Sequence, residues 1–174
     1  MMSQAQIFLS AVILTWLVVC MAFDLRTRQV PAVLTLVPLA AAAIVRLILG
    51  GWPIVFQVAA LVLISDLRWP KYRIPLACCV SALAFLASPE AIFTILVILT
   101  VWVQWDVGAT GGADVKIIIS LVLLFADGLI FIPVVLAGGI QGLVGLIAKQ
   151  KSIPFTVSIV LGTAAWLWLK AGLI

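Results

Sequence analysis

The chain has 174 residues, of which 66% are hydrophobic and only 9% are charged. A soluble domain carries about 25% charged residues, so this sequence excludes an ordinary water-soluble globule and the lipid bilayer is its expected solvent. The net charge of +4 is too small to indicate nucleic-acid binding. With no histidine and no CxxC pair, a zinc site of the usual type is excluded as well. We expect neither a metal nor a cofactor.

The first apolar run, near residues 5–23, has no Lys or Arg before it. It therefore lacks the basic region of a secretory signal and is predicted to remain as a transmembrane helix. Further apolar runs follow between short polar breaks, many of them marked by proline. They lie near residues 31–49, 53–66, 74–88, 90–105, 114–126, 128–147 and 154–170.

Three of these runs, 53–66, 74–88 and 114–126, are shorter than the ~20 residues that span a bilayer core. Tilting, kinking or burial among other helices is expected for them. The pattern predicts an all-α fold, a polytopic transmembrane helical bundle of eight helices, with six or seven as alternatives. No linker is visible, so residues 1–174 are predicted to form a single integral membrane domain.

The basic residues indicate the orientation. With eight crossings and the N-terminus outside, the breaks at 24–30, 66–73, 106–116 and 148–153 face the cytoplasm. They hold eight of the ten basic residues, namely Arg26, Arg28, Arg68, Lys71, Arg73, Lys116, Lys149 and Lys151. Cytoplasmic loops are rich in Lys and Arg, so this orientation in the inner (plasma) membrane is predicted. Arg46 and Lys170 fall at the other face, where long side chains can reach the interface.

Two segments carry the candidate chemistry, Asp24 to Pro31 after the first run and Gly111 to Lys116 before the sixth. Asp24 ends a helix that runs inward, and Asp114 begins one that runs outward, so both are expected at the cytoplasmic boundary. If the two helices are neighbours, the carboxylates can face each other. Small residues next to Asp114 let backbones approach closely, and they leave a slot for an extended peptide.

Two neighbouring carboxyl groups cannot easily be ionised at the same time. They therefore share one proton. Such a pair can activate a water molecule and protonate a departing amide without a metal. Helix dipoles favour Asp114, at a helix N-terminus, as the anion, so we expect Asp24 to hold the proton more often. Taken singly, each aspartate also fits a plain helix cap or a solvated residue at the membrane edge.

The D-x-R-x-x-x-V-P pattern from Asp24 to Pro31, followed by G-G-A-D-V-K from Gly111 to Lys116, resembles the type IV prepilin and preflagellin peptidases. These are intramembrane aspartic peptidases with one aspartate after an early helix and another in a GxGD motif. The segment 153–155, Ile-Pro-Phe, is similar to their closing segment. The resemblance implies that Asp24 and Asp114 are the catalytic residues.

The resemblance also places the two glycines of the GxGD motif at Gly111 and Ala113. Ala113 departs from the family pattern, because the second glycine has gained a methyl group, while Gly112 adds flexibility. The implied substrate-binding residues are Gly111, Gly112, Ala113 and Lys116. Lys116 stands where the family has a lysine, although it also fits a cytoplasmic anchor.

The distance between the two motifs is longer than in short family members, by about one helical hairpin near residues 67–105. This hairpin follows Asp66, which is a rival partner for Asp114. Asp24 is preferred because its spacing to the following proline matches the family. Asp106 precedes the glycines and is interpreted as a solvated loop acid.

The implied reaction is cleavage of the basic leader from a prepilin-like precursor at the cytoplasmic membrane boundary. The partners expected are this membrane-protein substrate and the lipid bilayer, without nucleic acid. Family members that also N-methylate the trimmed pilin carry a loop with CxxC motifs, which this chain lacks, so it resembles a peptidase-only member. Two alternatives stay open, a small ion or solute transporter and a catalytically inactive relative that serves as an assembly subunit.

Overall fold

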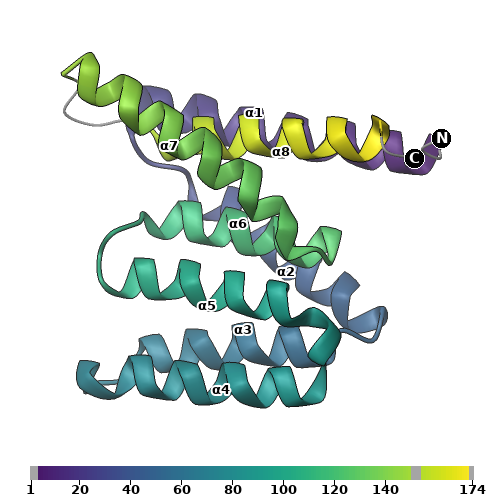
Figure 1. Ribbon diagram of the computed structural model, residues 1–174, viewed down its shortest axis with the longest axis vertical. Coiled ribbons are helices and arrows are strands. Elements are labelled where there is room, and N and C mark those ends of the chain that lie inside the picture. Colours follow the sequence, from purple (N-terminus) through teal and green to yellow (C-terminus); the bar gives the residue numbers. More distant parts are fainter. Residues whose placement is uncertain (1–3, 150–153, 173–174) are drawn as a thin grey trace. The chain divides into compact units, whose positions relative to one another are not determined.

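The computed structural model describes residues 4–149 and 154–172, and it forms eight α-helices and no strand within them (Figure 1). The prediction of an all-α helical bundle with eight helices is confirmed. The helices are α1 (Gln4–Thr27), α2 (Ala32–Ile48), α3 (Trp52–Ser65), α4 (Arg73–Ala87), α5 (Ile92–Asp106), α6 (Gly112–Phe125), α7 (Phe131–Ile147) and α8 (Phe155–Gly172). Short 3-10 turns, η1 (Pro70–Tyr72), η2 (Pro89–Ala91) and η3 (Gly128–Ile130), precede α4, α5 and α7.

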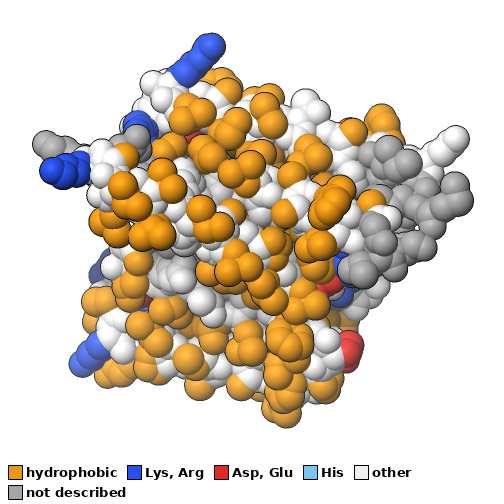
Figure 2. Space-filling view, turned by 45° about the horizontal axis from the view of Figure 1, so that its top comes forward, with side chains coloured by type: hydrophobic (Ala, Val, Ile, Leu, Met, Phe, Trp, Pro, Cys, Tyr) orange, Lys and Arg blue, Asp and Glu red, His pale blue; other side chains and the backbone are white. Residues whose placement is uncertain are grey.

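Within the described ranges, three helical segments are long and apolar enough to cross a membrane: Phe8–Thr27, Pro89–Asp106 and Gly128–Ile147. Large hydrophobic side chains are also strongly exposed, for example Leu86 at 74% and Leu146 at 78%. Figure 2 shows hydrophobic side chains over most of the visible face, with most of the charged ones near its edges. Such a surface is stable in lipid rather than in water. The chain is a membrane protein.

The helices group into two compact units. Unit 1 contains α1, α7, α8 and the first residues of α2, and it is drawn from Met1–Leu34 and Ile130–Ile174. Unit 2, Thr35–Leu129, contains the rest of α2 together with α3, α4, α5 and α6. The single-domain organisation stays a prediction.

In unit 1, α8 packs against both α7 and α1. The contact with α7 depends on Gly162, because a Cβ there would lie 2.4 Å from the Cα of Val134 and 2.8 Å from the carbonyl carbon of Pro133. Helices in lipid associate through small residues that allow such an approach. α7 and α8 are therefore closely packed around Gly162.

A proline in α2 links this helix to α1. Pro38 has no N–H, so the carbonyl of Leu34, four residues earlier, lacks its helical donor. The indole N–H of Trp16 in α1 donates a hydrogen bond of 2.8 Å to that carbonyl. A backbone group freed in an apolar setting is thus paired by a side chain of another helix, as membrane helices require.

In unit 2, α4 packs against α3 and α5, and α5 packs against α6. Gln57 of α3 is fully buried, and its Nε2 donates to the Ser81 hydroxyl of α4 at 2.9 Å and to the Ile95 carbonyl of α5 at 3.0 Å. All residues from Ile117 to Leu123 of α6 are buried. The short run predicted near 114–126 is thus an interior helix, because a helix that is apolar on all sides is stable when other protein surrounds it.

Candidate functional site

Asp24 lies in the last turn of α1, and its side chain is half-buried. The helix ends just after it, where Arg28 adopts a left-handed conformation (φ 57°) and donates its N–H to the Asp24 carbonyl at 2.9 Å. One oxygen of the Asp24 carboxyl group accepts a hydrogen bond from another helix. The hydroxyl of Thr156, in the first turn of α8, donates to Asp24 Oδ2 at 2.7 Å.

Asp114 lies in the first turn of α6, which begins at Gly112, two residues before the predicted start. Gly111 is the N-cap residue, and a Cβ there would lie 3.1 Å from Asp114 Oδ2. The carboxyl group therefore lies close over the N-cap. A glycine at position 111 leaves room for the carboxylate at the helix N-terminus, where an anion is favoured.

Both aspartates consequently lie beside helix N-terminal turns, Asp24 beside that of α8 and Asp114 within that of α6. The expectation that Asp24 holds the shared proton considered only the dipoles of the two helices that carry the aspartates, α1 and α6. Because the structure adds a hydroxyl donor and a second helix terminus next to Asp24, the dipole argument no longer distinguishes the two carboxyl groups.

The turn before α6 is shaped by Gln104. Its carbonyl accepts from the N–H of Ala109 at 2.7 Å and of Thr110 at 3.2 Å, and its side-chain oxygen accepts from the Thr110 hydroxyl at 3.2 Å. Gly108 has φ +76°, a conformation that favours glycine. These contacts set the position of the Gly-Gly-Ala-Asp segment against the end of α5.

Gly112 packs beside Trp105, since a Cβ at Gly112 would lie 3.1 Å from the indole nitrogen. Both residues line a cavity of about 260 Å³ between helices of unit 2. The wall is mostly apolar, with Ser65, Asp66 and Lys116 as its polar side chains. The lining residues are Leu36, Leu39, Val58, Leu61, Val62, Ser65, Asp66, Trp102, Trp105, Gly112, Val115, Lys116 and Ile119.

Two of the predicted substrate-binding residues, Gly112 and Lys116, therefore line one cavity, and the rival acid Asp66 lines it too. Lys116 is half-buried, whereas Asp66 is exposed at the C-terminal end of α3. Gly111 and Ala113 flank Gly112 at the start of α6. This juxtaposition places an apolar space and two opposite charges next to the residues before Asp114.

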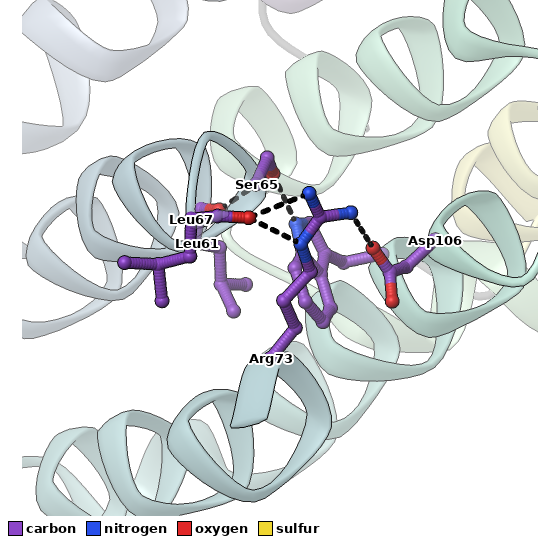
Figure 3. A network of polar contacts seen from close by, with 6 residues as sticks. Leu61, Ser65, Leu67, Arg73 and Asp106 are labelled. Atoms are coloured by element: carbon purple, nitrogen blue, oxygen red, sulfur yellow. Dashed lines mark hydrogen bonds and ion pairs between the residues drawn. The ribbon is translucent and has the colours of Figure 1, made fainter. Parts of the chain in front are cut away.

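The interpretation of Asp106 as a solvated loop acid is wrong. It is the last residue of α5, and its side chain is only 10% exposed. Arg73 of α4 pairs with Asp106 Oδ1 at 3.2 Å and also donates to the Leu67 carbonyl at 2.8 Å, as Figure 3 shows. Burial is tolerated here because the charge is paired, and α4 thereby joins the segment after α3 to the end of α5.

Asp24 belongs to unit 1, and Asp114 belongs to unit 2. The meeting of these two carboxyl groups stays a prediction. Of the closing Ile-Pro-Phe segment, Pro154 and Phe155 are described, and Ile153 lies outside the described residues. Among the described residues, no group of three or more His, Cys, Asp or Glu side chains could hold a metal ion.

Sequence reasoning missed Thr156 and Trp105, which contact the candidate site residues. Thr156 directly follows the Pro-Phe pair that the resemblance had singled out, so its neighbourhood was a usable signal. No sequence signal marked Trp105, because aromatic residues are common in apolar helices. Its role depends on packing between α5 and α6.

Comparison of the chain with protein-family models, with curated proteins and with solved structures finds no match.

Proposed function

We propose that this chain is an intramembrane aspartic endopeptidase that removes the basic leader from type IV prepilin-like precursors. The observation that carries the proposal is the pair of motifs, Asp24 to Pro31 and Gly111 to Lys116, in one small polytopic chain. Each motif places an aspartate at a helix end. Because the sequence has no histidine, these carboxyl groups are the best candidates for an acid–base pair.

The local geometry supports this function. Asp24 is held by a hydroxyl donor from another helix, at 2.7 Å. Asp114 is preceded by residues without bulky side chains, and one of these, Gly112, lines an apolar cavity of about 260 Å³. A fixed carboxyl group and a space that accepts apolar side chains are what cleavage next to a hydrophobic helix needs.

In the proposed reaction the two carboxyl groups share one proton. The ionised one takes a proton from a water molecule, and the resulting hydroxide attacks the carbonyl carbon of the scissile peptide bond. The protonated one donates to the amide nitrogen as the C–N bond breaks. A metal is not required for either step.

The proposed location of the reaction is the cytoplasmic boundary of the inner membrane. Four helices, α2 to α5, separate Asp24 from Asp114 in the chain. When each of them crosses the bilayer, the even number returns the chain to the same face. The basic residues beside both motifs favour the cytoplasm for that face.

Asp66 is the best candidate to attract the basic leader. Asp106 is paired with Arg73, which cancels most of its field, whereas Asp66 is exposed and lines the cavity next to Gly112. Asp66→Asn is therefore expected to weaken leader binding at low salt.

The test is cleavage of candidate prepilins by the purified protein in lipid nanodiscs, analysed by mass spectrometry. Wild type is expected to release the leader, and Asp24→Asn and Asp114→Asn are each expected to lower the rate at least about 1,000-fold, as for removal of an essential acid or base. Glu90→Gln, an exposed acid in η2, is the matched control and is expected to keep full activity.

Each alternative predicts a different outcome. If a variant without Asp24 and Asp114 still transports an ion or solute at the wild-type rate, the peptidase proposal is contradicted. A folded wild type that cleaves none of the candidate prepilins would support an inactive assembly subunit. Disulfide cross-linking of Asp24→Cys with Asp114→Cys, in a chain freed of its native cysteines, tests the proximity of the pair directly.

A further inference from the structure

Thr156 makes a contact that the proposed reaction does not yet use. Its side chain is only 2% exposed, and its hydroxyl donates to Asp24 Oδ2 at 2.7 Å across 132 positions of sequence. A hydroxyl has one proton to donate. That proton is directed at one particular oxygen of the proposed catalytic carboxyl group.

The start of α8, which carries Thr156, is fixed by α7. Gln141 of α7 donates from Nε2 to the Pro154 carbonyl at 3.0 Å, and its Oε1 accepts from the Ser158 hydroxyl. Gly138 of α7 lies beneath the Phe155 ring, where a Cβ would meet Cε2 at 2.8 Å. The helix turn on both sides of Thr156 is thus held in place, and the hydroxyl has little freedom to leave Asp24.

We infer that Thr156 is a positioning residue for Asp24, an inference that rests on the proposed peptidase function. A donor at Oδ2 fixes the rotation of the carboxyl group and occupies that oxygen. The other oxygen, Oδ1, then exchanges the proton with the water molecule or with the second carboxyl group. Thr156 itself touches neither the substrate nor the water.

The test compares Thr156→Val with Thr156→Ser in the nanodisc cleavage assay. Val keeps the shape and removes the donor, whereas Ser keeps the donor. We expect Thr156→Val to lower kcat about 10- to 100-fold, the effect of a misplaced catalytic group. We expect KM to stay unchanged, because substrate contacts are intact, and Thr156→Ser to retain most of the wild-type kcat.

Thr163→Val is the matched control. Thr163 lies on the same helix and is fully buried, and its hydroxyl has no hydrogen-bond partner among the described residues. The same substitution there removes a buried hydroxyl without touching Asp24, so kcat is expected to be unchanged. If Thr156→Val does not fold, Thr156→Ala against Thr156→Ser makes the same comparison with less crowding.

The outcomes separate the inference from the proposed function. If the wild type and Thr156→Val cleave with the same kcat, the positioning role is overturned and the peptidase proposal stands. Equal losses in Thr156→Val and Thr156→Ser, or a rise in KM alone, also overturn it. A folded wild type that cleaves no prepilin overturns the proposed function, and the positioning role falls with it.

Discussion

At the scale of single residues, the candidate site depends on two glycines, which have no side chain to fill the space next to their neighbours. Gly111 and Gly112 have neighbours at 3.1 Å from the position of an added Cβ, Asp114 Oδ2 for the first and Trp105 Nε1 for the second. Ala113 lies between Gly112 and Asp114 in the first turn of α6 and is half-buried there. The methyl group of Ala113 is therefore accommodated within the helix.

Gly111→Ala is expected to lower the cleavage rate about 10-fold, because the new methyl group pushes the Asp114 carboxylate out of position. The rate is measured with purified protein and a candidate prepilin. Gly142→Ala is the control, since a Cβ at Gly142 meets nothing within 4 Å. Equal rates for Gly111→Ala and wild type would show that the carboxylate does not depend on this space.

At the scale of elements, long donor side chains join helices to acceptors outside them. Pro38 leaves the Leu34 carbonyl without its helical donor, and Trp16 supplies one from α1 at 2.8 Å. Arg73 similarly binds the Leu67 carbonyl just after α3 and the Asp106 carboxylate at the end of α5. In both places a long donor side chain joins its own helix to an acceptor outside that helix.

Trp16→Phe is expected to lower the free energy of unfolding by about 1–2 kcal/mol, because it leaves the Leu34 carbonyl with only the long contact of the Cys20 thiol, at 4.0 Å. The measurement is unfolding by a denaturing detergent in mixed micelles. In a Pro38→Ala background the new backbone N–H can donate to Leu34, so the same change is expected to cost less. Identical costs in both backgrounds would mean that Trp16 contributes packing alone.

At the scale of the whole molecule, charge and hydropathy govern how the chain sits in the membrane. Most helices expose large hydrophobic side chains, and the basic residues concentrate in alternate connections. Because moving these charges across a bilayer is costly, we propose that the basic connections lie in the cytoplasm, together with the two aspartates.

This topology predicts opposite labelling of two connections. In a chain without native cysteines, Leu49→Cys, between α2 and α3, is expected to react with an impermeant maleimide added outside intact cells. Ala109→Cys, between α5 and α6, is expected to react only after the membrane is opened. Both native residues are exposed, so accessibility in the folded protein is matched. The reverse pattern would invert the orientation and move the proposed site to the outer face.

The sequence by itself determined the membrane class, the number of helices and their approximate bounds, because long apolar runs and the breaks between them are local features. It also determined that Asp24 and Asp114 lie at helix ends. Tertiary structure alone decided which side chains these helices bring together: Thr156 to Asp24, Arg73 to Asp106 and Trp16 to Leu34. The physical reason is that a helix apolar on all sides has no stripe that marks its packing face. In this chain the packing faces are set by glycines, a proline and a few polar side chains, whose partners lie far away in the sequence.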